Sequence, residues 1–501
     1  MRRRRCEIKP PADLNCDPHP TSGGLSLVTS VRTQPPSTSA VTSSELRPDA
    51  LGFPALLAQS IALISPTMTA VLIIPLAFSN AGQGTWLAYL FGTAMLLFVV
   101  FNLNQFARRS TSPGSMYAYT GRGLGAVGGV LSGWTLIWSY LFIGVAGMTG
   151  FTIFSRQFLD IVGMHTSIPA FVFFAISAVL CWTLAVKDIR LSSMLTLILE
   201  GLSVVCILAL AAIVLFKHGI VIDTAQVHLE GVTFRGMSLA VVACIFSLVG
   251  FESATALGGE ARNPLRTIPK AVIWSLILTG LFFVFMGYVE VFGTQGQHDT
   301  LDTLATPLNT LADLNNVGYF KLPLSLGAMI SFFALSLSCL NAGARIIYPM
   351  ARHSVFPARL GKVHTSNATP AAALSAYILL MFAVPALWST QIDVVTVFNG
   401  AGTLAAFGFL LAYFMVSVAA PIHLRKLGEL KLRNVIVAVL ALVFLLVPTV
   451  GSFYPLPAYP VYLFPYIFLA YMVVGAGWLF VASRRRRGIL REIETDLEAA
   501  S

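Results

Sequence analysis

Long apolar runs separated by short polar stretches follow one another along most of the chain. Each run has about 20 residues with few or no charged side chains, which is enough for an α-helix to cross the hydrocarbon core of a bilayer. The pattern predicts twelve membrane-spanning helices joined by loops. Their expected ranges are 51–79, 85–107, 123–152, 167–186, 190–216, 236–258, 271–294, 322–350, 370–390, 394–421, 432–452 and 458–482.

Composition supports the same class of protein. Of the 501 residues, 56% are hydrophobic and 11% are charged, whereas soluble domains carry about 25% charged residues. A soluble fold of this length would need a far more polar surface. The chain is therefore expected to be an all-α, polytopic membrane protein.

The basic balance of the chain has a simple interpretation in such a protein. The net charge is +10, and basic residues of membrane proteins gather on the cytoplasmic side, so no nucleic-acid partner is expected. With an even number of spans, the distribution predicts that both termini are cytoplasmic, in a protein of the plasma (inner) membrane. The Arg484–Arg487 run is expected to fix this topology and to contact anionic membrane lipids. Lys and Arg residues expected on the opposite side are Arg156, Lys217, Arg235 and Lys321.

Two spans carry helix-breaking residues at the same position. In "ALISPTMTAVLIIP" (62–75), Pro66 has no N–H and frees backbone groups near the middle of the membrane. In "FSLVGFESATALGG" (246–259), Gly250 lowers the helix propensity. Ser65 and Gly250 each lie 14 residues after the start of their spans, at positions 51 and 236. A pair of interrupted helices at corresponding positions is the best sequence indicator of a transporter's binding site.

The matching breaks indicate two repeats related by inversion, because five spans, an odd number, separate them. The alternative is that Pro66 and Gly250 only kink ordinary helices. Residues 1–46 are rich in Pro, Ser and Thr and lack apolar periodicity, which is typical of a disordered tail. The expected organisation is a basic cytoplasmic tail at 1–46, a transporter domain at 47–483 with repeats at 51–216 and 236–421 and two further helices at 432–482, and a cytoplasmic C-terminal tail at 484–501.

Three stretches resemble the amino acid–polyamine–organocation superfamily. The run "GFES…GGEARNPLRTIPKAV" (250–273) is similar to its sixth helix and following loop, "NAGARIIYPMARHSVFPARLGKVHTSNATP" (341–370) to its eighth helix and the loop beyond, and "SMYAYTGRGLG" (115–125) to its loop between helices two and three. The resemblance is fairly specific for bacterial amino acid permeases. It implies the inverted five-plus-five fold of the leucine-transporter type with two further helices, and transport of amino acids or related amines.

The sequence departs from the superfamily pattern at two places. Many members have a Gly-x-Gly-rich break in helix one, where this chain has the bulkier stretch Ser65–Ala70. An Asp-Gly pair is common after "MAR", where this chain has Ser354 and Val355. The first departure lies at the expected binding site and therefore affects how a substrate fits.

The two breaks predict a clamp for a zwitterionic α-amino acid. The first amides after the break in the first span would attract a carboxylate, and the last carbonyls before the break in the sixth span would suit an ammonium group. In the superfamily an aromatic residue on helix six closes over the substrate, and Phe246 matches its position better than Phe251. Trp134 and Trp138 favour packing, and Tyr140 is left open. The candidate substrate-binding residues are Ser65, Thr67, Met68, Thr69, Ala70, Phe246, Ser247, Val249, Gly250 and Phe251.

Two acids lie deep in the predicted spans, Glu252 at the start of the inner half of the sixth and Glu200 in the fifth. Intramembrane acids are functional candidates by default, and both are expected to couple transport to protons. The alternative for each is a structural hydrogen bond. Some members of the superfamily have a lysine near the position of Glu200, so their mechanism does not carry over unchanged. Sodium is the weaker hypothesis, because no carboxylate is expected beside the serines of the eighth span, Ser331, Ser336 and Ser338.

These residues favour proton-coupled amino acid uptake by alternating access. A polyamine or organic-cation importer, or an exchanger, would need intramembrane acids beyond Glu200 and Glu252, and no others are expected. A non-transporting nutrient sensor is favoured only by the basic tail. The spans hold no nucleophile–base pair, metal-ligand cluster or nucleotide-binding loop, so no enzyme activity, catalytic residue, cofactor or metal site is expected.

Overall fold

The computed structural model describes residues 49–110, 115–164, 167–187, 189–219, 221–296, 300–304, 306–364, 367–454, 459–486 and 488–499. The chain divides into two units, Met1–Thr42 and Ser43–Ser501, and every element below belongs to the second. The tail predicted at 1–46 lies outside the described residues.

The described chain is built from helices, which confirms the predicted fold class. Eleven helical segments are long and apolar enough to cross a membrane. The first, Phe53–Ala107, has 55 residues and contains two of the predicted spans, and each of the others matches one. The others are Met116–Ile161, Ala170–Lys187, Met194–Lys217, Phe234–Glu260, Pro264–Gly293, Gly318–Arg352, Ala371–Trp388, Val394–Lys426, Leu432–Gly451 and Val461–Arg485.

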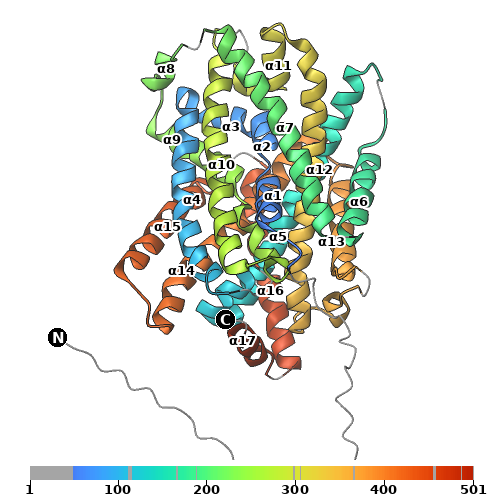
Figure 1. Ribbon diagram of the computed structural model, residues 1–501, viewed down its shortest axis with the longest axis vertical. Coiled ribbons are helices and arrows are strands. Elements are labelled where there is room, and N and C mark those ends of the chain that lie inside the picture. Colours follow the sequence, from blue (N-terminus) through green and yellow to red (C-terminus); the bar gives the residue numbers. More distant parts are fainter. Residues whose placement is uncertain are drawn as a thin grey trace, which may run out of the picture. The chain divides into compact units, whose positions relative to one another are not determined.

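Figure 1 shows how these helices group. α5 (Met116–Ile161) packs against α12 (Lys321–Arg352) and α14 (Val394–Lys426), and these three form the centre of the bundle. α6 packs with α13 on one side of this centre and α15 packs on α14 on the other. Apart from the two interrupted helices described below, the other helices of the described chain are α4 (Thr85–Ala107), α6 (Ala170–Lys187), α7 (Ile189–Lys217), α8 (Thr224–Val227), α10 (Pro264–Gly293), α11 (Pro307–Leu314), α13 (Ala371–Trp388), α15 (Leu432–Gly451), α16 (Phe464–Arg485) and α17 (Ile489–Ala499).

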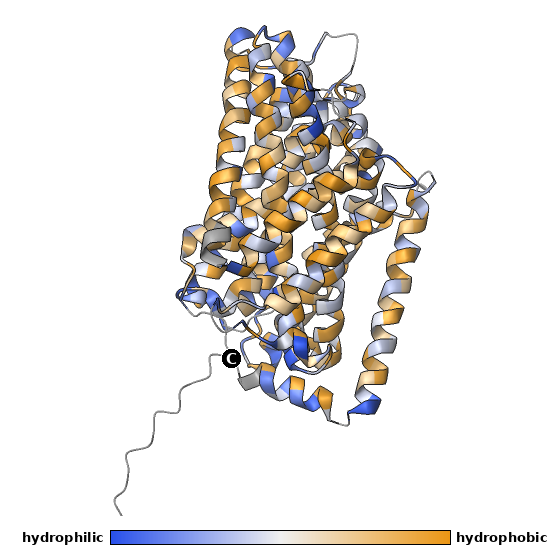
Figure 2. Ribbon diagram, turned by 90° about the vertical axis from the view of Figure 1, so that its right-hand side faces the viewer, coloured by the Kyte–Doolittle hydropathy of each residue, from blue (hydrophilic) through white to orange (hydrophobic). Residues whose placement is uncertain are grey.

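Apolar side chains cover the outside of the bundle as well as its core. Figure 2 shows hydrophobic residues along the middle of the helices and hydrophilic residues gathered toward the two ends. Val179, Leu379 and Val473 are 60%, 65% and 72% exposed. Lipid tails are as apolar as these side chains, so a bilayer accommodates this surface where water would not.

Glycines let the central helices approach closely. A Cβ atom on Gly408 of α14 would lie 2.1 Å from the Oγ of Ser139 in α5, and one on Gly147 of α5 would lie 2.4 Å from the Oγ of Ser336 in α12. Small residues at such contacts favour helix packing in membranes, where burial of apolar surface does not drive association. The three helices therefore provide a closely packed support for the two interrupted helices.

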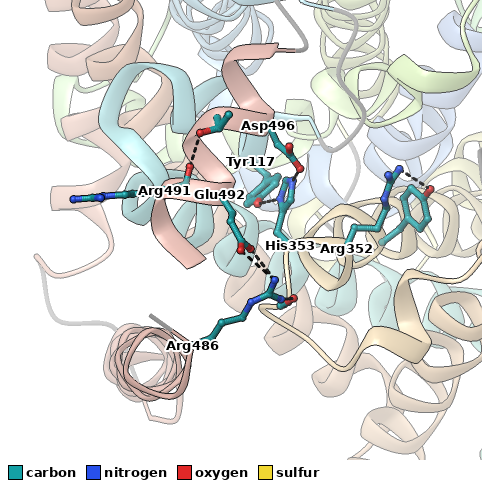
Figure 3. A network of polar contacts seen from close by, with 10 residues as sticks. Tyr117, Arg352, His353, Arg486, Arg491, Glu492 and Asp496 are labelled. Atoms are coloured by element: carbon teal, nitrogen blue, oxygen red, sulfur yellow. Dashed lines mark hydrogen bonds and ion pairs between the residues drawn. The ribbon is translucent and has the colours of Figure 1, made fainter. Parts of the chain in front are cut away.

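The segment after α16 contains a docked helix, α17, and Figure 3 shows its contacts around His353. Arg122 of α5 donates from its Nε to the carbonyl oxygen of Leu497 at 2.9 Å. His353 lies just beyond α12, with its ring hydrogen-bonded to Tyr117 and its Nε2 3.4 Å from the carboxylate of Asp496. α17 is thus held to both α5 and the end of α12, and we refer to this part of the bundle as the α17 end.

Candidate functional site

The first predicted break is present at Ser65. Ser65 adopts the left-handed conformation (φ 52°), which ends one helix, and Pro66 begins the next, a position where its missing N–H carries no penalty. The Oγ of Ser65 accepts a hydrogen bond from the N–H of Met68 at 3.4 Å and replaces part of the interrupted ladder. The span therefore consists of α1 (Phe53–Ile64), α2 (Pro66–Met68), a π-helix (Thr69–Ile73) and α3 (Ile74–Ala81).

Glu200 of α7 reaches across to this break. Its Oε1 accepts hydrogen bonds from the N–H and the Oγ1 of Thr67, both at 3.2 Å. Its Oε2 accepts one from the Oγ of Ser331 in α12. The buried carboxylate therefore joins α7, the start of α2 and α12.

This arrangement corrects one expectation and constrains another. Sodium coupling was disfavoured because no carboxylate was expected beside the serines of α12, but the carboxylate of Glu200 does bind Ser331, so that premise is wrong. Ser336, by contrast, donates to the carbonyl of Phe332 at 3.1 Å. Moreover, the amide of Thr67 was expected to attract a substrate carboxylate, and in this conformation it donates to Glu200. A substrate would have to compete with Glu200 for this donor.

The second predicted break is present at Val249 and Gly250. α9 (Phe234–Leu248) ends where Val249 turns extended (ψ 152°), and the chain resumes as a 3₁₀-helix, η3 (Phe251–Glu260). Gly250 has a φ of 100°, and a Cβ there would lie 2.1 Å from Leu63 of α1, so only glycine fits both the backbone and the space. Because the chain leaves the helix here, the last carbonyls of α9 have no helical donor after them.

Glu252 lies in the first turn of η3, as predicted, and two tyrosines hold it. The hydroxyl of Tyr140 in α5 donates to its Oε1 at 2.8 Å, and that of Tyr413 in α14 donates to its Oε2 at 2.6 Å. The Tyr413 hydroxyl also accepts the N–H of Gly250 at 3.2 Å, and its ring stacks on Phe251 with 5.0 Å between centroids. Glu252 therefore ties the second break to the central helices.

The two interrupted helices also bond directly to each other. The Oγ of Ser60 in α1 donates to the carbonyl of Phe251 at 2.8 Å and accepts the N–H of Ala254 at 3.1 Å. The Oγ of Ser253 donates to the carbonyl of Gln59 at 3.3 Å. The buried hydroxyl of Ser60 thus satisfies two backbone groups of the short 3₁₀-helix, and Ser253 binds the backbone of α1 in return.

Phe246 lies beside a cavity of about 230 Å³. Its ring reaches from α9 to Gly402 of α14, where an added Cβ would lie 2.4 Å from the Phe246 Cζ. Val249 lines the same cavity, so two of the candidate binding residues meet there. The other lining residues are Leu76, Asn80, Leu239, Val242, Ala243, Ile245, Thr403, Ala406, Phe407, Leu410, Pro448, Gly451 and Ser452.

The remaining candidate residues are buried around the breaks. Thr69, Met68 and Ala70 are 0–2% exposed, and among the described residues the Oγ1 of Thr69 has no hydrogen-bond partner. Ser247 donates to the carbonyl of Ala243 at 3.0 Å. A buried hydroxyl without a partner is rare, which makes Thr69 the one polar candidate of this group with a hydrogen bond still to make.

The aromatic residues of α5 divide between packing and the site. Trp134 donates from its indole to the carbonyl of Tyr471 at 3.3 Å, and Trp138 to that of Leu404 at 2.7 Å, which supports packing for both. Tyr140, left open by the sequence, contacts Glu252. Tyr413 was not selected from the sequence, although a hydroxyl-bearing ring in an apolar span is a usable signal, because it needs a partner when buried.

Buried acids are more numerous than expected, and the expectation of no acids beyond Glu200 and Glu252 is wrong. Glu290 of α10 is fully buried. Glu260, at the end of η3, forms a two-pronged ion pair with Arg345 of α12, at 2.5 and 2.9 Å, and both side chains are 0% exposed. In the described part of the chain, no three His, Cys, Asp or Glu side chains form a group that could hold a metal ion.

Comparisons with known proteins agree with this architecture. The crystal structure of a manganese transporter mutant from Eremococcus coleocola superposes with a TM-score of 0.54 over 88% of this chain and 94% of that chain, at 11% identity, which shows a shared leucine-transporter-type fold. The branched-chain amino acid permease BcaP of Bacillus subtilis is 23% identical over 70% of this chain and 76% of its own length. The low-affinity putrescine importer PlaP of Escherichia coli is 24% identical over 66% and 72%. The family model described as amino acid permease matches residues 56–492, and the chain belongs to that family of transporters.

Proposed function

We propose that this protein is a secondary active transporter that takes up an amino acid by alternating access and is driven by the proton gradient. Membership of the amino acid permease family supports a small-molecule substrate. The two interrupted helices support a central site with free backbone groups. In the cell, both ends of the chain are expected on the cytoplasmic face of the plasma membrane.

The observation that carries the proposal is the bond between Glu200 and the amide of Thr67. A carboxylate accepts hydrogen bonds from backbone N–H groups more strongly than a neutral carboxyl group does. When Glu200 binds a proton, its hold on Thr67 weakens, and the amide becomes available to the carboxylate of an amino acid. Substrate and proton then favour each other's binding, and this reciprocity is the coupling that symport requires.

The ammonium group of the substrate is proposed to bind the last carbonyls of α9. These carbonyls lie beside Phe246 and Val249, which border the cavity described above. Phe246 would then close over the bound side chain, because its ring already crosses to Gly402 of α14. Glu252 is proposed as the second proton-coupling acid, since protonation would weaken its bonds to Tyr140 and Tyr413 and release η3 from α5 and α14.

Uptake of radiolabelled leucine into proteoliposomes under a pH gradient tests the proposal. Glu200→Gln resembles the protonated side chain, so it should retain leucine exchange between the two sides but lose gradient-driven accumulation at least tenfold. Glu252→Gln should also lose proton-driven uptake. Glu230→Gln, an exposed acid, is the matched control and should behave as wild type. Full accumulation by Glu200→Gln would overturn its coupling role.

A second candidate function is import of a polyamine or other organic cation. The specific observation in its favour is that the spans hold more buried acids than Glu200 and Glu252, which is what a pocket for an organic cation is expected to show. The putrescine importer among the relatives is consistent with this candidate. Competition of leucine uptake by putrescine distinguishes the two, and dependence of uptake on an internal amino acid would identify an exchanger.

A further inference from the structure

Glu290 is an acid for which the described structure supplies no side-chain partner. It lies in α10, one turn before the helix ends at Gly293, and is fully buried. Neither oxygen of its carboxyl group has a hydrogen-bond partner. Thr294 donates at 2.8 Å, but to the backbone carbonyl of Glu290 rather than to its side chain.

The surroundings of Glu290 connect it to the second break. One turn earlier on α10, a Cβ on Gly287 would lie 3.5 Å from the ring of Tyr89 in α4, and Tyr89 is within electrostatic range of Glu290. The hydroxyl of Tyr89 lies 3.3 Å from the Oγ of Ser247, in the last turn of α9. A movement of α9 against α4 would therefore change the environment of Glu290.

Three other charged side chains at this end of the bundle are engaged with partners of their own. Lys217 of α7 donates to the carbonyl of Asn315, and Lys321 pairs with Asp313 at 2.7 Å. Asp223, next to α8, accepts the N–H of Ala225 at 3.0 Å and a bond from Gln295. No cation among these groups is free to neutralise Glu290.

An ionised carboxylate in such a place costs several kcal/mol, because it has lost water without gaining a hydrogen bond. A bound ammonium group would need space beside the carboxylate, yet the cavity at Phe246 is lined by no residue of α10. A proton needs no such space. The geometry points to a proton as the ligand: we propose that Glu290 is a third proton-binding residue of the transport cycle, at the end of the bundle opposite α17.

In chemical terms, a proton from the outer water adds to a carboxylate oxygen of Glu290 when the site is hydrated, and the same O–H bond breaks when the site is next opened to water. As this bond forms, an O–H bond of the donating hydronium ion breaks and leaves water, and the reverse transfer returns the proton to water; no other bond changes. This inference rests on the proposed proton-coupled transport, but proton binding at Glu290 can be measured without any transport.

The first test is the infrared difference spectrum of reconstituted protein between alkaline and acidic pH, without substrate. Titration of Glu290 adds a carboxyl C=O band that Glu290→Gln should lose and Glu230→Gln should keep. Identical difference spectra for Glu290→Gln and wild type would show that Glu290 is permanently neutral or permanently ionised, and would overturn the inference. This result would leave amino acid transport itself untouched.

The second test counts protons per leucine from the gradient that just stops net uptake. Each coupled proton contributes about tenfold in accumulation per pH unit of gradient. Glu290→Gln should therefore accumulate leucine about tenfold less than wild type at a gradient of about one pH unit, while leucine exchange and the melting temperature are unchanged. An unaltered proton count in Glu290→Gln would contradict the inference, whereas absence of proton-driven uptake by the wild type across a panel of amino acids would contradict the proposed function instead.

Discussion

The buried ion pair between Glu260 and Arg345 leads to a quantitative prediction. Both side chains are 0% exposed, and the guanidinium makes two bonds to the carboxylate, at 2.5 and 2.9 Å. Removing one partner leaves the other charge buried without compensation, which typically costs about 3–5 kcal/mol. Arg345→Met should therefore lower the folding equilibrium constant by a factor of about 10² to 5 × 10³. Glu260→Met should have a similar effect.

Replacing both partners removes both charges, so the double variant should recover most of this loss. The assay is denaturant unfolding in mixed micelles for the four proteins of the double-mutant cycle. The matched control is Arg109→Met, whose pair with Glu429 at 2.7 Å is exposed and should contribute at most about 1 kcal/mol. If Arg345→Met costs less than about 1 kcal/mol, or if its effect adds to that of Glu260→Met, the reasoning is refuted.

Three further predictions concern the breaks and the α17 end. Gly250→Ala should cost about 1–3 kcal/mol of unfolding free energy, because its φ is 100° and its Cβ would meet α1 at 2.1 Å. Gly477→Ala in α16, with open space around it, should be neutral or stabilising by up to about 1 kcal/mol, because a helix interior favours alanine over glycine; equal destabilisation of the two variants would contradict this. Tyr413→Phe removes a 2.6 Å bond to Glu252 and should cost about 1.5–3 kcal/mol in the same assay, and an unchanged midpoint would show that this bond is dispensable. Burial lowers the pKa of His353 from its ordinary 6.5, so the folded state favours the neutral ring and loses stability as the pH falls below about 6.5. Melting temperatures measured across this range should fall less for His353→Gln than for wild type, and parallel curves for the two proteins would contradict this prediction.

The interruption of both helices could be predicted from single residues. Pro66 cannot continue a helix ladder, and Gly250 tolerates a backbone that other residues avoid, so the breaks follow from local chemistry. Glu252 was selected by the same local reasoning, since an acid in an apolar run must find a partner. The partners themselves, Tyr140 and Tyr413, come from helices 112 and 161 residues away in sequence, and no local pattern identifies such pairs.

Glu290 illustrates a different limit. It stands in the apolar run "FFVFMGYVEVFG" (282–293), but near the end of a predicted span, where an acid commonly reaches the interface. Only the packing of α10 against α4 and its other neighbours shows that the side chain is fully buried. Likewise, the sequence gives no reason to place Glu200 beside Ser331, because the two lie 131 residues apart.

By itself, the sequence determined that the chain crosses a membrane many times, where the helices lie and where two of them break. These properties depend on the composition of short segments and on the solvent around them, because a bilayer leaves a hydrogen-bonded helix as almost the only option for an apolar segment. The tertiary structure decided which donors face which acids: that Glu200 holds the amide of Thr67, that Glu260 is paired with Arg345, and that the carboxyl group of Glu290 has no hydrogen-bond partner in the part of the chain that the structure describes. Such pairings depend on how helices rotate and approach one another, and similar apolar helices can pack in many ways until side-chain shape and buried hydrogen bonds select one.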